Sequence, residues 1–114
     1  MTDRKPICFI GRSLDDLRLF PRSARRAAGY QLDRVQQGLE PDDWKPLKGV
    51  GAGVREIRIR DVNGAFRVIY VARFREAIFV LHCFQKRSEK TAQRDIDLIA
   101  RRYRTLQEET DHEA

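Results

Sequence analysis

The alternation of apolar and polar residues along the chain predicts four β-strands, at residues 6–10, 54–60, 66–74 and 77–84. The last of these segments is almost continuously apolar, which is typical of an interior strand that is buried on both faces. Asn63-Gly64 predicts a tight hairpin between the second and third strands, and Arg75-Glu76 forms a second short connection. The three later strands are therefore expected to form an antiparallel meander.

Apolar residues at helical spacing predict three helices. A short helix begins at Ser13, which we expect to cap it, and ends before Pro21. A second helix covers residues 21–37 and ends at Gly38, and the last begins after Thr91. The apolar stripe of this last helix consists of Ala92, Ile96, Ile99, Tyr103 and Leu106.

The order of these elements predicts an α+β fold. It has an N-terminal strand and two helices, a three-stranded antiparallel meander that completes a sheet of roughly four strands, and a C-terminal helix. We expect residues 1–106 to form a single domain, because a chain of 114 residues supports one hydrophobic core. Residues 107–114 are predicted to form an acidic, disordered tail.

Composition excludes several classes of protein. No run of about 18 apolar residues is present, so no membrane span is expected, and the N-terminus lacks the apolar core of a secretion signal. Cys8 and Cys83 both lie in apolar runs and are interpreted as core residues rather than zinc ligands. A cytoplasmic protein with no metal and no cofactor is the prediction.

Positive charge is concentrated in the predicted domain. The chain carries 23 basic and 17 acidic residues, a net charge of +6. Its last eight residues contain four acidic residues and no Lys or Arg, so the net charge of residues 1–106 is +10. Such a surface attracts polyanions, of which RNA is the first candidate.

The basic residues recur at the ends and on the faces of the predicted strands. Arg58 and Arg67 flank the hairpin, and the sequence does not fix whether they are cross-strand neighbours. If they are, the two like charges need a carboxylate or a bound anion between them. Tyr70 is a candidate for stacking on a base. The other candidates for contacting RNA are Lys48, Arg55, Lys86, Arg87 and Lys90.

Candidates for proton transfer are few. His82 is the one histidine of the predicted domain and is expected on the same strand face as Ile78, Val80 and Phe84. It is interpreted either as a hydrogen-bonded core residue or as a general acid or base. Glu56 stands among basic residues and is interpreted as their salt-bridge partner. The three glycines at residues 49–53 indicate a mobile loop or a close approach to a ligand.

Taken together, several segments of the chain resemble the phage-related, HigB-like branch of the RelE/ParE toxin superfamily. They are K-G at residues 48–49, V-R-E-I-R at 54–58, F-R-V-I-Y at 66–70 and V-L-H-C-F-Q-K-R-S-E-K-T at 80–91. The resemblance covers about residues 48–103, and the two upstream helices suit the same fold.

The resemblance implies the toxin of a type II toxin–antitoxin pair, a metal-independent endoribonuclease that cuts mRNA on the ribosome. It implies that Arg67 and Arg87 bind and stabilise the phosphate, with Lys86 and His82 as further catalytic candidates. Arg58 matches a basic position on the preceding strand. Gln93 stands where a tyrosine is often found in the family, so His82 or a lysine would have to act as the base.

Two other functions fit the same residues. One is a non-enzymatic inhibitor of DNA gyrase, as on the ParE side of the superfamily, and the other is an inactive, phage-derived RNA-binding module. Under the toxin hypotheses we expect a cognate antitoxin with a helix-turn-helix domain. The ribosome and mRNA are further partners of the ribonuclease.

Overall fold

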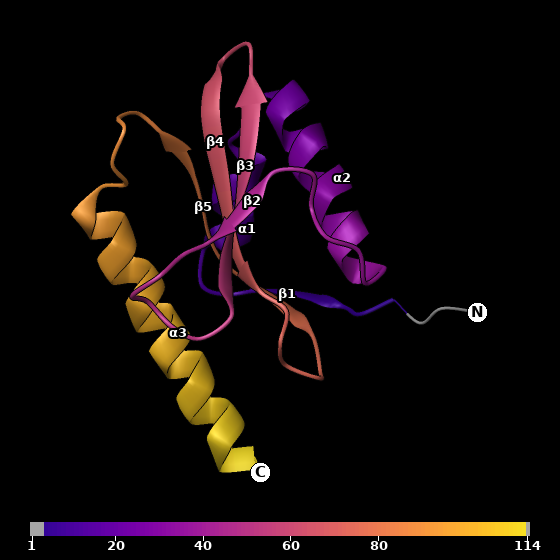
Figure 1. Cartoon of the computed structure of the whole chain (residues 1–114), viewed down its shortest axis with the longest axis vertical. Coiled ribbons are helices and arrows are strands. Elements are labelled where there is room, and N and C mark those ends of the chain that lie inside the picture. The colour runs from indigo at the N-terminus through magenta and orange to yellow at the C-terminus, as the bar shows by residue number, and fades with distance from the viewer. Residues whose placement is uncertain (1–3, 114) are drawn as a thin grey trace.

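The computed structural model describes residues 4–113, which form a five-stranded mixed sheet with helices on both faces (Figure 1). The order of strands across the sheet is β1-β5-β4-β3-β2, with β1 parallel to β5 and the other neighbours antiparallel. The strands are β1 (Ile7–Phe9), β2 (Trp44–Pro46), β3 (Val54–Asp61), β4 (Gly64–Val71) and β5 (Ile78–Lys86). The helices are α1 (Ser13–Arg18), α2 (Arg22–Gln36) and α3 (Gln93–Glu113).

The predicted α+β architecture is confirmed, with one additional strand. Strand β2 lies in a segment for which the sequence predicted no helix or strand. It is three residues long, which is too short to show an alternating pattern. It forms by pairing with the edge of β3, where Trp44 lies opposite Ile57. The hairpin after β3 is also present, with Asp61 paired to Gly64.

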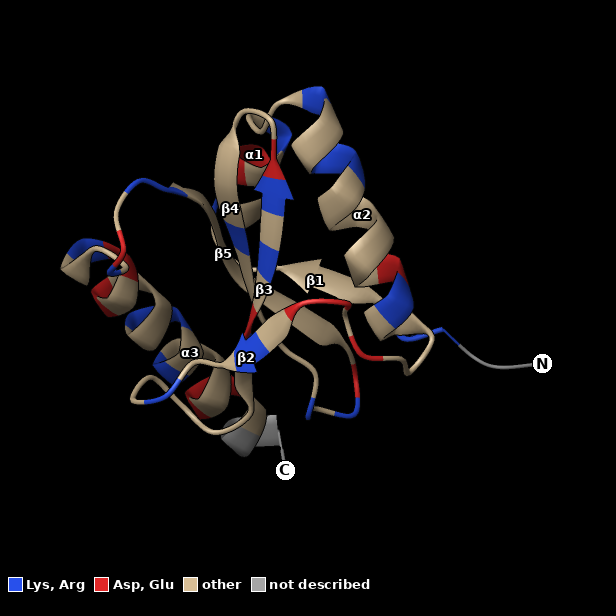
Figure 2. Cartoon of the chain, turned by 45° about the horizontal axis from the view of Figure 1, so that its top comes forward, with Lys and Arg blue, Asp and Glu red and all other residues tan. Residues whose placement is uncertain are grey.

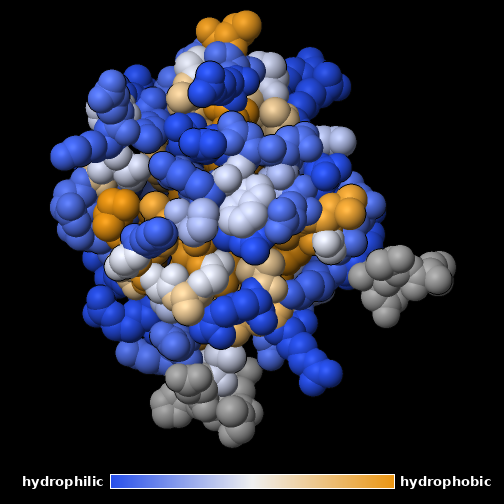
Figure 3. Space-filling model, viewed as in Figure 1, coloured by the Kyte–Doolittle hydropathy of each residue, from blue (hydrophilic) through white to orange (hydrophobic). Residues whose placement is uncertain are grey.

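The two faces of the sheet carry separate hydrophobic cores. Helices α1 and α2 cover one face, and the buried Ala24 and Ala28 allow α2 to approach the sheet closely. Helix α3 covers the other face through Ile99, Tyr103 and Leu106. Hydrophobic residues on the outer surface seen in Figure 3 lie in small separate groups among hydrophilic ones.

A β-bulge changes the facing of side chains along β5. The register shifts between Ile69 and Tyr70 of β4, which pair with His82 and Val80, so Leu81 is the extra residue. Beyond the bulge, His82 faces α3, whereas Val80 packs into the α1/α2 core. The prediction that these two share a face is therefore wrong, because the alternation is reversed at Leu81.

The ends of the helices differ in part from the predictions. Ser13 is buried, and its hydroxyl donates to the Val80 carbonyl at 3.1 Å, so Arg12 rather than Ser13 occupies the N-cap position. Gly38 follows the end of α2 with a φ of +85°, as predicted for a glycine at a helix C-terminus. Helix α3 continues to Glu113, so the expected boundary at residue 106 is not the end of the helix. Residue 114 of the predicted tail lies outside the described residues.

The glycine loop between β2 and β3 packs against α3. A Cβ on Gly51 would lie 2.4 Å from the Tyr103 ring, so only glycine fits this close approach. The Tyr103 hydroxyl donates to the Ala52 carbonyl at 3.0 Å and accepts from the Arg73 guanidinium at 2.8 Å. The group that the loop approaches is therefore a helix of the same chain.

The two cysteines are expected to react at different rates with a thiol reagent. Cys83 is buried, and burial raises the pKa of its thiol to about 12, whereas Cys8 is exposed, contrary to the sequence prediction. Because the thiolate is the reacting form, native protein at pH 8 should release colour from one thiol with Ellman's reagent, and denatured protein from two. Two rapidly reacting thiols in the native protein would contradict this burial.

Candidate functional site

The register of the central strands places charged residues in rows on the face that α3 partly covers. Arg58 of β3 pairs directly with Arg67 of β4, which in turn pairs with Phe84 of β5. In the neighbouring row, Lys45 of β2 lies opposite Glu56 of β3. We refer to Lys45, Arg58 and Arg67 as the basic face. Figure 2 shows the resulting band of Lys and Arg along β2 and β3.

Arg58 is held at the rim of the basic face by Asp43. Its Nε donates to Asp43 Oδ1 at 2.8 Å, and its Nη2 lies 2.7 Å from the same oxygen. Both side chains are partly exposed, so solvent screens their attraction. Asp43 is thus the carboxylate that allows Arg58 to lie opposite a second arginine.

Arg67 is more deeply placed. Its side chain is 11% exposed, and Nη1 donates to the Phe66 carbonyl at 3.0 Å. Its Nε lies 3.7 Å from Oε1 of Glu56, and the same oxygen lies 3.6 Å from the Lys45 ammonium. Glu56 itself is 1% exposed. Burial lowers the pKa of the Arg67 guanidinium and the Glu56 carboxylate opposes this effect. An arginine pKa starts so high that Arg67 stays charged at neutral pH.

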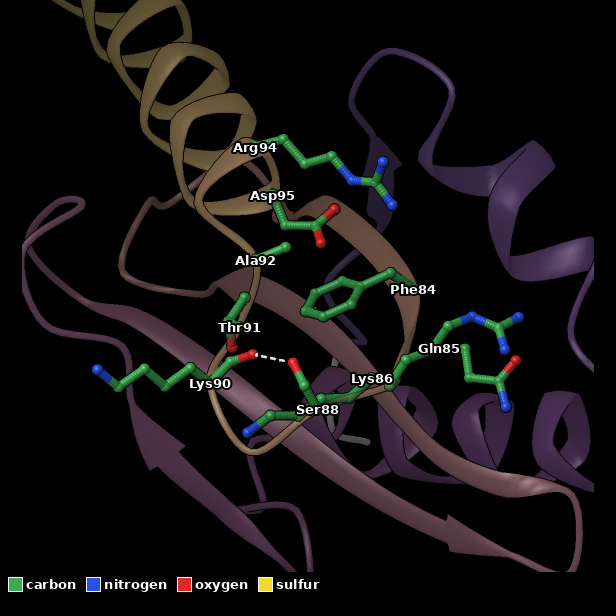
Figure 4. Close-up of a pocket in the computed structure, with 10 residues that line it drawn as sticks. Phe84, Gln85, Lys86, Ser88, Lys90, Thr91, Ala92, Arg94 and Asp95 are labelled. Atoms are coloured by element: carbon green, nitrogen blue, oxygen red, sulfur yellow. Dashed lines mark hydrogen bonds between the residues drawn. The ribbon is translucent and has the colours of Figure 1, made fainter.

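A small cavity of about 130 Å³ lies where β5 ends and α3 begins (Figure 4). It brings together Lys86, Arg87 and Lys90 with Phe84 and Asp95. In Figure 4, the Phe84 ring lies between the end of β5 and the first turn of α3. Arg87 also lines a second cavity, of about 340 Å³, that reaches Leu19 and Phe20 at the end of α1.

His82 connects β5 to α3. Its Nε2 lies 2.8 Å from Asp95 Oδ1, and because a carboxylate only accepts, Nε2 carries the proton. The imidazole is 6% exposed and is stacked on Phe84 with ring centroids 4.9 Å apart. Within the described residues, its Nδ1 is buried without a hydrogen-bond partner.

Three of the predicted RNA contacts lie away from the basic face. The Tyr70 ring is 1% exposed in the α1/α2 core, so it cannot stack on a base in this structure. Arg55 pairs with Tyr70 in the sheet and stacks on Trp44, with its guanidinium carbon 4.0 Å from the ring centroid. Lys48 is exposed in the loop before β3, at the opposite end of that strand from the hairpin.

Four residues of the site were not predicted from the sequence: Lys45, Asp43, Phe84 and Asp95. Lys45 lies in β2 and Asp43 immediately before it, and β2 was not predicted. Asp95 could have been found as the acidic residue in the first turn of α3, close in sequence to the basic turn that follows His82. Phe84 was recognised only as a strand residue.

The basic face and the cavity are suited to holding a phosphodiester. Guanidinium groups bind two phosphate oxygens at once, and Arg58 and Arg67 present two of them side by side. Within residues 4–113, no group of three or more side chains is placed to bind a metal ion. In the same part of the chain, no helix is long and apolar enough to cross a membrane.

Comparisons with known proteins identify both a family and a fold. The family model described as phage derived protein Gp49-like (DUF891) matches residues 15–104. No curated protein matches the sequence of this chain. A solved structure of a mutant of the E. coli toxin RelE in the free state is similar, with a TM-score of 0.56 and 19% identity. That match covers 72% of this chain and 83% of the RelE chain.

Proposed function

Because this chain belongs to the phage-derived Gp49-like family, we propose that it is the toxin of a type II toxin–antitoxin pair that cleaves mRNA on the ribosome. The observation that carries the proposal is the direct pairing of Arg58 with Arg67 on the α3-facing side of a RelE-like sheet. Two adjacent arginines near a cavity lined by further cations are suited to a phosphodiester substrate, and the family and the fold agree with such a substrate.

The reaction that suits these residues is transesterification at a ribose. The 2′ hydroxyl gives its proton to solvent water as its oxygen attacks the adjacent phosphorus, and the bond to the 5′ oxygen breaks. The 5′ oxygen takes up a proton, so a 2′,3′-cyclic phosphate and a 5′ hydroxyl are formed. Arg67 and Arg87 would stabilise the additional negative charge on the phosphorane. Arg58 would position the RNA strand, and Lys90 would bind a flanking phosphate.

The proton transfers are assigned by exposure. We assign donation of a proton to the leaving 5′ oxygen to Lys86, which is partly exposed beside Phe84 at the cavity. His82 is enclosed between Phe84 and Asp95, so its role in this proposal is to hold the first turn of α3 against β5.

The proposal includes two kinds of partner. The toxin would act in the cytoplasm on mRNA held by the ribosome. A cognate antitoxin, which we expect to carry a helix-turn-helix domain, would neutralise it by covering the basic face. An acidic antitoxin surface would match the net charge of the toxin.

A reconstituted translation reaction tests the proposal directly. Purified protein should cut mRNA that is being translated and leave the same RNA nearly intact when ribosomes are omitted, with cleavage mapped by primer extension. Gyrase-dependent DNA damage without mRNA cleavage would instead support the inhibitor of gyrase. Expression without growth arrest would indicate an inactive RNA-binding module.

A further inference from the structure

Glu56 is an ionisable residue buried under the basic face. Its side chain is 1% exposed, and it lies in the middle of β3, where its direct partners across the sheet are Lys45 and Ile69. Arg67 is its diagonal neighbour on β4, since Arg67 pairs with the residue two positions further along β3. A single oxygen, Oε1, is the nearest carboxylate atom to both Lys45 and Arg67.

The contacts of Glu56 are electrostatic rather than hydrogen-bonded. Its Oε1 is 3.6 Å from Lys45 Nζ and 3.7 Å from Arg67 Nε, beyond the range of a good hydrogen bond. Within the described residues, neither this oxygen nor Arg67 Nε has a hydrogen-bond partner. Leaving both groups buried and unsatisfied is costly, which favours a functional reason for their retention.

The pair formed by Arg58 and Asp43 shows what Glu56 does differently. In that pair two nitrogens of Arg58 contact one oxygen of Asp43, and both side chains are partly exposed, so the pair is hydrogen-bonded and screened by water. The Arg67 guanidinium is held through Nη1 by a backbone carbonyl, while Glu56 attracts its Nε side. Nη2 is therefore the part of the guanidinium that remains for an external anion.

We propose that Glu56 is a positioning residue that fixes the orientation of the Arg67 guanidinium and lowers the affinity of the resting basic face for anions. This inference rests on the proposed function for the reaction that Arg67 serves. A negative charge beneath the face weakens the binding of every phosphate to it, whereas a fixed guanidinium accelerates only the cleavage step. Glu56 therefore acts in opposite directions on binding and on catalysis.

Substitution of Glu56 by Gln separates these two effects. It removes the charge and keeps the size of the side chain. Inorganic phosphate and an uncleavable 2′-deoxy oligonucleotide should bind roughly three- to tenfold more tightly, as expected from the loss of one nearby negative charge. In single-turnover cleavage of ribosome-bound mRNA, the maximal rate should fall about tenfold while the half-saturating concentration decreases.

Two further variants serve as controls. Glu76→Gln removes the same charge from the exposed turn between β4 and β5 and should change both readouts by less than about twofold. Glu56→Asp keeps the charge but shortens its reach, so it should retain the wild-type affinity for phosphate and lose part of the cleavage rate. A merely structural role would instead lower binding and rate together with stability.

The wild-type protein allows a test that does not depend on whether the variant folds. The Nε–H proton of Arg67 should give a resolved NMR signal that exchanges slowly with water and shifts when phosphate is added. A rapidly exchanging, averaged signal would overturn the proposal, as would unchanged phosphate affinity in Glu56→Gln. The binding and NMR measurements require no cleavage, so they decide the role of Glu56 even if the wild type does not cut mRNA.

Discussion

Arg67→Ala is expected to abolish growth arrest and to lower the rate of mRNA cleavage by about 10²–10³-fold, the usual effect of removing one donor that stabilises a transition state. Arg67 lies next to Arg58 on the basic face, and under the proposed function its Nη2 would contact the reacting phosphate, because Nη1 already donates to the Phe66 carbonyl. The measurements are growth after induction and single-turnover cleavage. Arg67→Lys keeps the charge without the planar fork and should recover only part of the activity.

A matched control distinguishes this loss from a general effect of charge. Arg25→Ala removes the same charge from an exposed site on α2, on the other side of the sheet, and should stay within about twofold of the wild-type rate. Circular dichroism and thermal unfolding establish that both variants are folded. A fully toxic Arg67→Ala variant would show that the active-site assignment is wrong.

Gly51→Ala is expected to destabilise the protein by about 1–3 kcal/mol, because the new methyl group would overlap the Tyr103 ring. The ideal Cβ position is 2.4 Å from two carbons of the Tyr103 ring. The ring is held in place by its hydroxyl, which donates to the Ala52 carbonyl and accepts from Arg73. The loop or α3 must therefore shift. Chemical denaturation followed by circular dichroism measures the change in the free energy of unfolding.

Gly29→Ala is the matching substitution in open space. Gly29 lies within α2, and an added Cβ would meet no atom within 4 Å. Alanine lowers the backbone entropy lost on folding, so this variant should be more stable than the wild type by about 0.5–1 kcal/mol. Equal effects at the two glycines would show that the α3 contact of Gly51 contributes nothing to stability.

Some parts of the site could be predicted because local sequence determines them. The hairpin signal at Asn63-Gly64 placed Arg58 and Arg67 on adjacent antiparallel strands, but it left their register open. Only the structure shows that they pair directly. The family was likewise indicated by blocks of residues on these strands, and the match to the Gp49-like family confirms it.

Other parts could not be predicted because tertiary contacts decide them. Strand β2 exists only through its pairing with β3, so Lys45 and Asp43 gave no local signal of their position. Tyr70 has the residue type of a base-stacking group, yet the alternation along β4 directs it into the α1/α2 core. Glu56 was interpreted as a salt-bridge partner, but its burial is evident only when the sheet is assembled.

The bulge at Leu81 decides which side chains of β5 face α3 and which face α1 and α2. Before it, Val80 faces α1 and α2, and after it Cys83 does so, while His82 and Phe84 face α3. Arg102 of α3 supports this change of phase by donating to the Leu81 carbonyl at 2.7 Å. A β5 with the same residues but no bulge would present Cys83 to α3 and direct His82 away from Asp95. The bulge in this strand, as much as the chemistry of its residues, therefore determines which side chains of β5 lie on the face toward α3.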